Sequence, residues 1–230
     1  MRPTCQCFSQ RHTKHGRLSS LHRETQDTDC ESWQRLLHLI DLAVESGVET
    51  FVPLREFTQE QRADIVTLPP KIAELKSVKN FCLYGSCLTR IPPEIGEMES
   101  LESFDPYTSY FLHWFPYEIT RCAKLKDSRV STRAIYGNLK FRPPFPHLYQ
   151  SENQDAFSCV TPKNCSICNA VLDKSNVYRR WISTRVGTDV LPLLVNACSM
   201  NCIDLLPPTP ENYVDGPHTG GHHIQQPPPW

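Results

Sequence analysis

The chain has 230 residues, of which 39% are hydrophobic, and this is enough for one mid-sized domain or two small ones. Its formal net charge of −1 argues against a protein built mainly to coat nucleic acid or an anionic membrane. No apolar run reaches the roughly 18 residues that a membrane-spanning helix needs, and the start of the chain contains no apolar signal core. We therefore expect a cytoplasmic protein whose 11 cysteines stay reduced or bind metal.

Residues 1–27 are polar and basic and show no hydrophobic periodicity. This composition predicts a disordered arm. Cys5 and Cys7 lie within it, but they are too close together and too isolated to indicate a zinc site.

Residues 28–67 have the pattern of two helices. Thr28 with Glu31, and Thr58 with Gln61, have the spacing of helix capping boxes. After the first box, apolar residues recur at helical spacing and a glycine closes the helix; these are Trp33, Leu36, Leu37, Ile40, Ala43, Val44 and Gly47. We expect this segment to cover the open end of the region that follows, as a helical N-terminal cap.

The segment from residue 68 to 138 repeats itself. A Leu/Ile-Pro-Pro-x-Ile motif occurs at residues 68–72 and 91–95 and, in a looser form, at 115–119, so the step is 23 and then 24 residues. This period, with its L-x-x-L-x-L spacing, resembles the leucine-rich repeat family, in which each unit buries its apolar side only by stacking on its neighbours. The resemblance implies a short solenoid over residues 68–146, and an accidental Pro-rich repetition in an α/β domain is the alternative. The solenoid core would contain Leu75, Leu83, Ile95, Leu101, Ile119 and Leu125.

The same resemblance implies short parallel strands at residues 80–84, 103–107 and 127–131, with alternate side chains on a concave face. Pro106 should interrupt the second strand because proline has no N–H to donate. Proteins of this family recognise partner proteins without catalysis, usually through the concave face. That implies a partner-binding role for four outward side chains, Tyr84, Asp105, Tyr107 and Arg129. Asp105 and Arg129 could instead pair with each other across neighbouring strands.

Two proline-rich segments flank the last organised region. Residues 141–146 contain three prolines and must be extended, so they form either the C-terminal cap of the repeats or a stiff linker. Residues 214–230 are rich in proline and histidine, and we expect a flexible tail there.

Residues 147–213 contain two close cysteine pairs, Cys165 with Cys168 and Cys198 with Cys202. Four thiolates arranged in two pairs match the ligands of a tetrahedral structural zinc site. A strand-type hairpin lies between the pairs, and a helix could begin at the second pair. The order of knuckle, hairpin and helix resembles that of treble-clef zinc modules, which implies one structural Zn²⁺ per chain in a small α+β module.

Other roles for these cysteines stay open. They could be reduced core residues, or the first pair could be a redox centre, although no βαβ frame precedes it. Cys159 and His218 are further candidate ligands. A site with four cysteines is closed, so it would stabilise the fold and leave no position for a catalytic water.

No catalytic motif emerges from the sequence. The fold class we expect is α/β: a short leucine-rich repeat solenoid with a helical cap and a zinc-stabilised C-terminal module. The expected function is non-enzymatic binding of a protein partner, with no small-molecule substrate and no membrane. A zinc-containing adaptor of the nucleic-acid-binding or ubiquitin-ligase type is the alternative, although the near-neutral charge makes nucleic acid the less favoured partner.

Overall fold

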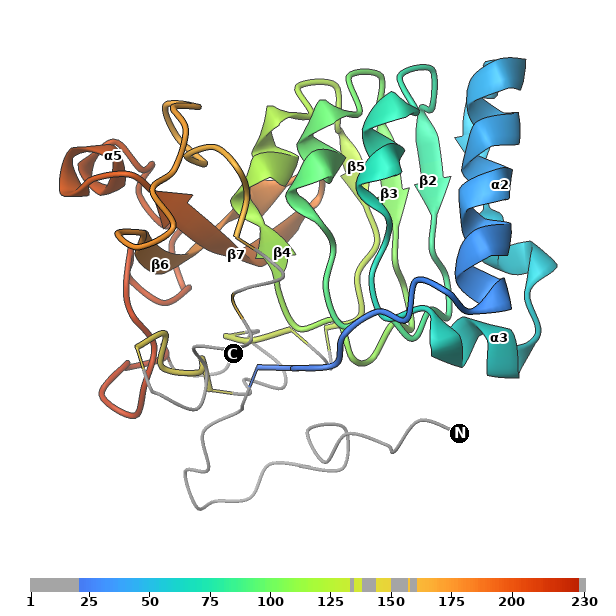
Figure 1. The fold of residues 1–230 in the computed structure, drawn as a ribbon. Helices are drawn as coiled ribbons and strands as arrows, with labels where there is room; N and C mark the ends of the chain where they lie inside the picture. The colour runs from blue at the N-terminus through green and yellow to red at the C-terminus, as the bar shows by residue number, and fades with distance from the viewer. Residues whose placement is uncertain (1–20, 133–134, 138–143, 150–156, 158–160, 228–230) are drawn as a thin grey trace.

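The computed structural model describes residues 21–132, 135–137, 144–149, 157 and 161–227, and shows a mixed α/β fold with two sheets (Figure 1). In chain order its elements are α2 (Glu31–Ser46), β1 (Thr50–Phe51), η1 (Pro53–Glu56), α3 (Gln59–Asp64), η2 (Pro70–Glu74), β2 (Asn80–Cys82), η3 (Pro93–Glu97), β3 (Ser103–Asp105), β4 (Phe115–Pro116), η4 (Tyr117–Arg121), β5 (Asp127–Ser128), β6 (Tyr178–Val186), β7 (Asp189–Ala197) and α5 (Met200–Asp204), where η denotes a 3₁₀ helix. Within the described residues, every helix is too short or too polar to cross a membrane.

The first sheet is parallel, with strand order β1-β2-β3-β5. Asn80 pairs with Ser103, and Ser103 pairs with Asp127, so the steps between neighbouring strands are the 23- and 24-residue steps of the sequence repeat. Equivalent side chains therefore stack: the rings of Phe81 and Phe104 lie 6.0 Å apart, and Phe51 of β1 continues the row at 5.8 Å from Phe81. The sequence period thus becomes the register of the sheet.

The three proline motifs form the 3₁₀ helices η2, η3 and η4, which lie in a layer beside the strands (Figure 1). Proline suits the start of η2 and η3 because its φ angle is preset and its missing N–H would have no partner there. The isoleucine of each motif points into the core, and Ile72, Ile95 and Ile119 are completely buried. The expected core positions Leu75, Leu83, Ile95, Leu101 and Ile119 are all at most 1% exposed, and Leu125 packs partly buried against them.

The strands are shorter than the sequence suggests, and β3 ends at Asp105, directly before Pro106. The backbone bonding nevertheless continues beyond the proline. Leu83 donates its N–H to the carbonyl of Asp105 and Gly85 donates to that of Tyr107, so the third strand contributes acceptors there and needs no N–H from Pro106.

The helical cap forms with one correction. Helix α2 covers the end of the parallel sheet near β1 (Figure 1), and Gly47 ends it with φ +59°, donating to the carbonyls of Ala43 and Val44. The second capping box, Thr58 with Gln61, is present at the start of α3. The first is absent, because α2 begins one residue after Cys30, whose side chain makes no capping bond, and Thr28 lies too early.

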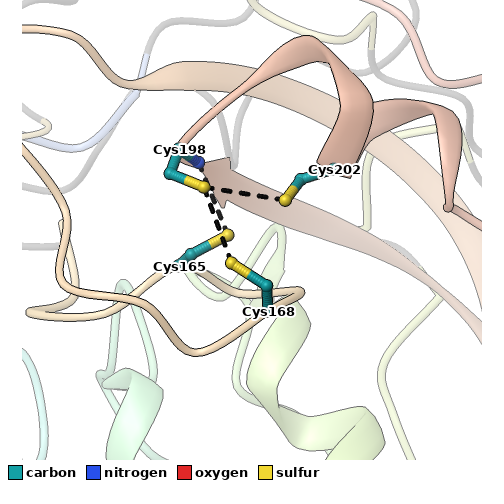
Figure 2. Close-up of side chains that lie close together, drawn as sticks. All are labelled: Cys165, Cys168, Cys198 and Cys202. Atoms are coloured by element: carbon teal, nitrogen blue, oxygen red, sulfur yellow. Dashed lines mark hydrogen bonds between the residues drawn. The ribbon is translucent and has the colours of Figure 1, made fainter.

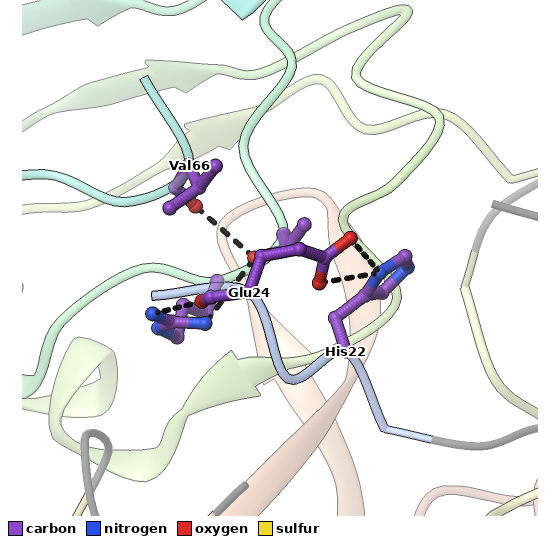
Figure 3. Close-up of polar contacts among 5 residues, drawn as sticks. His22, Glu24 and Val66 are labelled. Atoms are coloured by element: carbon purple, nitrogen blue, oxygen red, sulfur yellow. Dashed lines mark hydrogen bonds and ion pairs between the residues drawn. The ribbon is translucent and has the colours of Figure 1, made fainter. Parts of the chain in front are cut away.

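Part of the expected disordered arm is packed, because residues 21–27 follow the edge of the repeats. Leu21 is buried, and the His22 ring stacks on His113 at 5.3 Å while its Nδ1 faces the Glu24 carboxylate (Figure 3). The Glu24 carbonyl accepts a hydrogen bond from the buried Arg90. Residues 1–20, with Cys5 and Cys7, lie outside the described residues.

The second sheet joins the repeats to the cysteine-containing region, by which we mean residues 161–213. Strands β6 and β7 form an antiparallel hairpin, and β4, from the third repeat, pairs with β7 in parallel. The hairpin turn also covers β5: Thr188 Oγ1 donates to the Ser128 carbonyl, and Ser128 Oγ donates to the Val186 carbonyl. Gly187 is required in this turn because its φ is +60° and a Cβ would lie 2.9 Å from the Asp127 carbonyl carbon. The hairpin thus covers the last strand of the parallel sheet.

One hydrophobic cluster runs from Trp33 in α2 to Ile203 in α5. The repeats and the cysteine-containing region therefore share a core, although the sequence predicts a domain boundary between residues 146 and 147. A second cluster surrounds the fully buried Trp181 and includes Phe145 of the proline-rich segment. Residues 138–143 of that segment lie outside the described residues.

The tail is also more packed than the sequence suggests. Val214 and His218 are buried, and His218 exchanges two backbone hydrogen bonds with Trp181, of 2.8 and 3.0 Å. Ile224 packs against the second cluster. The expectation of flexibility fails for residues 214–224 because the Trp181 cluster supplies a surface that sequence periodicity does not reveal.

Candidate metal centre and the outer face of the parallel sheet

The first cysteine pair lies on a tight turn. An antiparallel bridge joins Asn164 to Val171, and inside it the Cys165 N–H donates to the Ala170 carbonyl. Asn169 has φ +61° and donates its N–H back to the Cys165 carbonyl. The turn therefore holds Cys165 and Cys168 on one side.

The second pair lies where the hairpin ends. Cys198 directly follows β7, and Cys202 is in α5, whose N-cap residue Ser199 accepts a hydrogen bond from the Cys202 N–H. The expected order of knuckle, hairpin and helix is present, with Met200 as the first helical residue.

The four sulfur atoms converge (Figure 2). All lie within 4.8 Å of one another; Cys198 Sγ is 3.5 Å from Cys168 Sγ and 3.6 Å from Cys202 Sγ. These separations are far longer than a disulfide bond of about 2.05 Å. Four sulfurs at about 2.3 Å from one tetrahedral ion would stand about 3.8 Å apart. The arrangement could therefore hold a metal ion.

The electrostatics of the cluster favour ionisation at Cys165. Burial opposes the thiolate there, but backbone N–H groups of Cys168, Ile167 and Cys198 point at the sulfur and lower its pKa to about 7. Hydrogen bonding with the Cys168 and Cys202 thiols raises the pKa of Cys198 to about 12. Protein groups alone thus stabilise a thiolate at Cys165 and oppose one at Cys198. A bound cation would supply the charge that a four-thiolate site needs.

The residues present fit a closed structural site. Cys165 and Cys202 are buried, Cys198 is partly exposed and Cys168 is exposed. The His218 ring packs against Phe145, and burial lowers its pKa to about 4; it is not among the grouped ligands. Cys159 lies outside the described residues.

The four-cysteine cluster is connected to the repeats by polar contacts that the sequence does not predict. Arg121 of η4 donates to the carbonyls of Cys165 and Ser166, at 3.2 and 3.1 Å. Ser166 Oγ donates to Glu118 Oε1 at 2.7 Å and accepts the Asn196 N–H at 3.0 Å. Glu118 occupies the motif position of Lys71 and Glu94 but is only 2% exposed, because the cysteine-containing region covers it.

The outer face of the parallel sheet carries the four expected partner-binding residues. Tyr84 and Tyr107 are 52% and 37% exposed, and their ring centroids lie 6.1 Å apart. The Arg129 guanidinium lies 4.6 Å from the centre of the Tyr107 ring. Asp105 accepts the Tyr107 N–H, and no ion pair joins Asp105 to Arg129. The structure thus brings these side chains together as a row of rings and charges.

A small pocket extends this face toward β1. It has a volume of about 180 Å³ and is lined by Val52, Leu54, Arg55, Arg62, Cys82 and Tyr84. The sequence does not point to Arg55 or Arg62, because both lie in the expected cap outside the repeat register. Arg55 and Arg62 lie next to Tyr84 only because η1 and α3 fold back beside β2.

No model of a known protein family matches the chain, and no curated protein matches it either. Functional inference therefore rests on the geometry described above.

Proposed function

We propose that this chain is a non-enzymatic, leucine-rich-repeat-type recognition protein that binds a protein partner through the outer face of its parallel sheet. The observation that carries the proposal is the agreement between the 23- and 24-residue sequence period and the strand register. Stacked units of this kind present one continuous face, and here that face exposes two tyrosines beside arginines. Tyrosine and arginine are enriched at protein interfaces and among their hot spots.

We further propose that Cys165, Cys168, Cys198 and Cys202 bind one structural Zn²⁺. The sulfur separations, the two tight pairs and the closed four-cysteine ligand set support zinc. None of the described cysteines forms a disulfide, which fits a reducing compartment such as the cytoplasm. When bound, zinc would fix the turn of the first pair against α5.

Metal content tests the zinc proposal directly. Elemental analysis of the purified full chain should find one zinc per chain, and four additional thiols should react after a chelator is added. Cys198→Ser should abolish zinc binding. Cys30→Ser is a matched control because Cys30 lies outside the cluster and serine is a favourable N-cap residue for α2. A folded protein that lacks metal and does not respond to the chelator would contradict the proposal.

Partner binding needs a separate experiment. Proteins recovered with the wild-type chain should be lost with Tyr84→Ala or Arg129→Glu, while the denaturation midpoint of either variant stays close to that of the wild type. Undiminished recovery with both variants would place recognition elsewhere on the molecule.

A further inference from the structure

The exposed apolar side chains of the parallel sheet gather in one place. Val52, Tyr84 and Tyr107 are 37%, 52% and 37% exposed; Val52 and Tyr84 line the same pocket, and Tyr84 contacts Tyr107. Three arginines surround them, Arg55 and Arg62 in the pocket and Arg129 over Tyr107. We name these six residues the tyrosine–arginine patch: Val52, Arg55, Arg62, Tyr84, Tyr107 and Arg129.

The patch carries excess positive charge. None of its three guanidinium groups forms an ion pair with another of the described residues. Arg62 uses its Nε to donate to the Phe57 carbonyl, which fixes the side chain beside Tyr84 and leaves its terminal nitrogens near the pocket. Asp105 lies on the same face and accepts the Tyr107 N–H. Anionic groups would therefore be attracted to both ends of the patch, with the two tyrosines between them.

The spacing of the positive groups defines a length. The pocket lies at the ends of β1 and β2, and Arg129 follows β5, so the row crosses up to three strand intervals, or about 14 Å at about 4.8 Å each. An extended peptide covers about 14 Å in four or five residues, because each residue spans about 3.3 Å.

We propose that the tyrosine–arginine patch binds an extended acidic peptide segment, in which two carboxylate side chains four or five positions apart flank apolar residues. One carboxylate enters the pocket beside Arg55 and Arg62, the other pairs with Arg129, and the apolar residues between them lie on Tyr84 and Tyr107. This inference rests on the proposed function in protein recognition and specifies the chemistry of the partner.

Single-stranded nucleic acid fits the patch less well, although its bases can stack on tyrosine. Asp105 and Asp127 lie on the same outer face, and Ser103 donates to Asp127 there. A backbone with a phosphate at each nucleotide would approach both carboxylates. A peptide can place its charges only at the two ends, where the arginines are.

A displayed library of random twelve-residue peptides, selected against the zinc-containing full chain, provides the test. Enriched peptides should share two acidic residues four or five positions apart with apolar residues between them. A synthetic consensus peptide should then bind the wild type at least tenfold more tightly than Arg62→Ala or Arg129→Ala. Replacing both acidic residues of the peptide by amides should cost a similar factor.

Lys76→Ala is the matched control. It removes the same charge from a lysine that binds the Glu97 carbonyl and the Glu99 carboxylate, away from the patch, and it should leave the affinity unchanged. Circular dichroism and metal content should show that each variant is folded and loaded with zinc.

The other outcomes would overturn the inference, and they separate it from the proposed function. Neutral or basic peptides that depend on Tyr84 and Tyr107 would refute the acidic segment and keep protein recognition. Displacement of the peptide by a twelve-residue oligothymidylate, with affinity that falls steeply with salt, would assign the patch to nucleic acid. If no peptide is enriched by the wild type over a Tyr84→Ala/Tyr107→Ala variant, the patch is not a peptide site.

Discussion

The parallel sheet and the cysteine-containing region are held together in different ways. In the sheet, each unit places the same kinds of side chain in the same register, and the buried rows of isoleucine, leucine and phenylalanine supply the stability. The cysteine-containing region has one long hairpin, a short helix of five residues and a tight turn, which bring four cysteine sulfurs together. The first region is stabilised by packing that repeats from unit to unit, whereas the second is stabilised by a few specific contacts.

This difference matters because the two regions are not independent. Strand β4 pairs with β7, the hairpin turn bonds to Ser128 of β5, and Arg121 bonds to the carbonyls at the first cysteine pair. The last strand of the parallel sheet would otherwise be an open edge, and here the hairpin turn of the cysteine-containing region covers it. We infer that a change at the four-cysteine cluster affects the nearest repeats, and that this effect weakens with distance from the cluster.

Cys165→Ser gives the strongest test of that coupling. A structural zinc ion, as proposed for this cluster, would contribute an apparent free energy on the order of 10 kcal/mol, so residues 161–205 should unfold in the variant. Hydrogen exchange monitored by mass spectrometry should show lost protection there, reduced protection in η4 and β5, and nearly unchanged protection in α2. Loss of protection that is equal in all repeats, or confined to residues 161–205, would contradict a graded coupling.

Leu101→Ala tests the stacked core of the repeats. Leu101 is completely buried, and removing its side chain costs the transfer free energy and leaves a cavity, so unfolding should become easier by about 2–5 kcal/mol. Chemical denaturation of the zinc-containing protein measures the change. An unmoved midpoint would show that the repeat core does not depend on this row.

The sequence predicts the parts of this fold that follow a period or a short motif. The repeat register, its buried positions, the Thr58 capping box and the two cysteine pairs are all local patterns, and the structure contains them. The repeated positions alone do not predict that Glu118 is buried while Glu94 is partly exposed, because the covering residues are about 50 positions away. The same reason explains why Arg55, Arg62 and the packed tail escape prediction. Contacts between segments that share no pattern leave no signal in one sequence.

Gly187→Ala tests whether the hairpin turn must lie close to β5. An alanine there would take an unfavourable positive φ, and its Cβ would also lie 2.9 Å from the backbone of Asp127, so we expect a loss of about 2–4 kcal/mol. Gly47→Ala is the control, because its φ of +59° carries the same strain while the nearest atom is 4.0 Å away. The control should lose only about 1 kcal/mol. Equal losses in thermal denaturation would show that the close approach to β5 contributes nothing.

The smallest expected effect concerns Glu118, at the junction of the two regions. Burial is the main influence on this carboxyl and raises its pKa, although the Ser166 hydrogen bond and Arg121 oppose the shift. The unfolded chain should titrate this group near pH 4.3. Between that pH and the raised pKa, the folded state binds more protons than the unfolded state, so the free energy of unfolding should fall as pH rises.

Glu118→Gln removes that contribution and can still accept the hydrogen bond from Ser166 through its amide oxygen. The difference in unfolding free energy between variant and wild type should therefore increase as pH rises from about 5 to 8, with zinc present throughout. Glu94→Gln removes a charge that helps to raise the Glu118 pKa, so its difference from the wild type should change in the same direction over this range, but by less than that of Glu118→Gln. Urea denaturation at each pH measures both differences. Parallel curves for wild type and Glu118→Gln would mean that ionisation of the buried carboxyl does not change the free energy of unfolding in this pH range. The hydrogen bond from Ser166 would then be its main contribution to holding the two regions together.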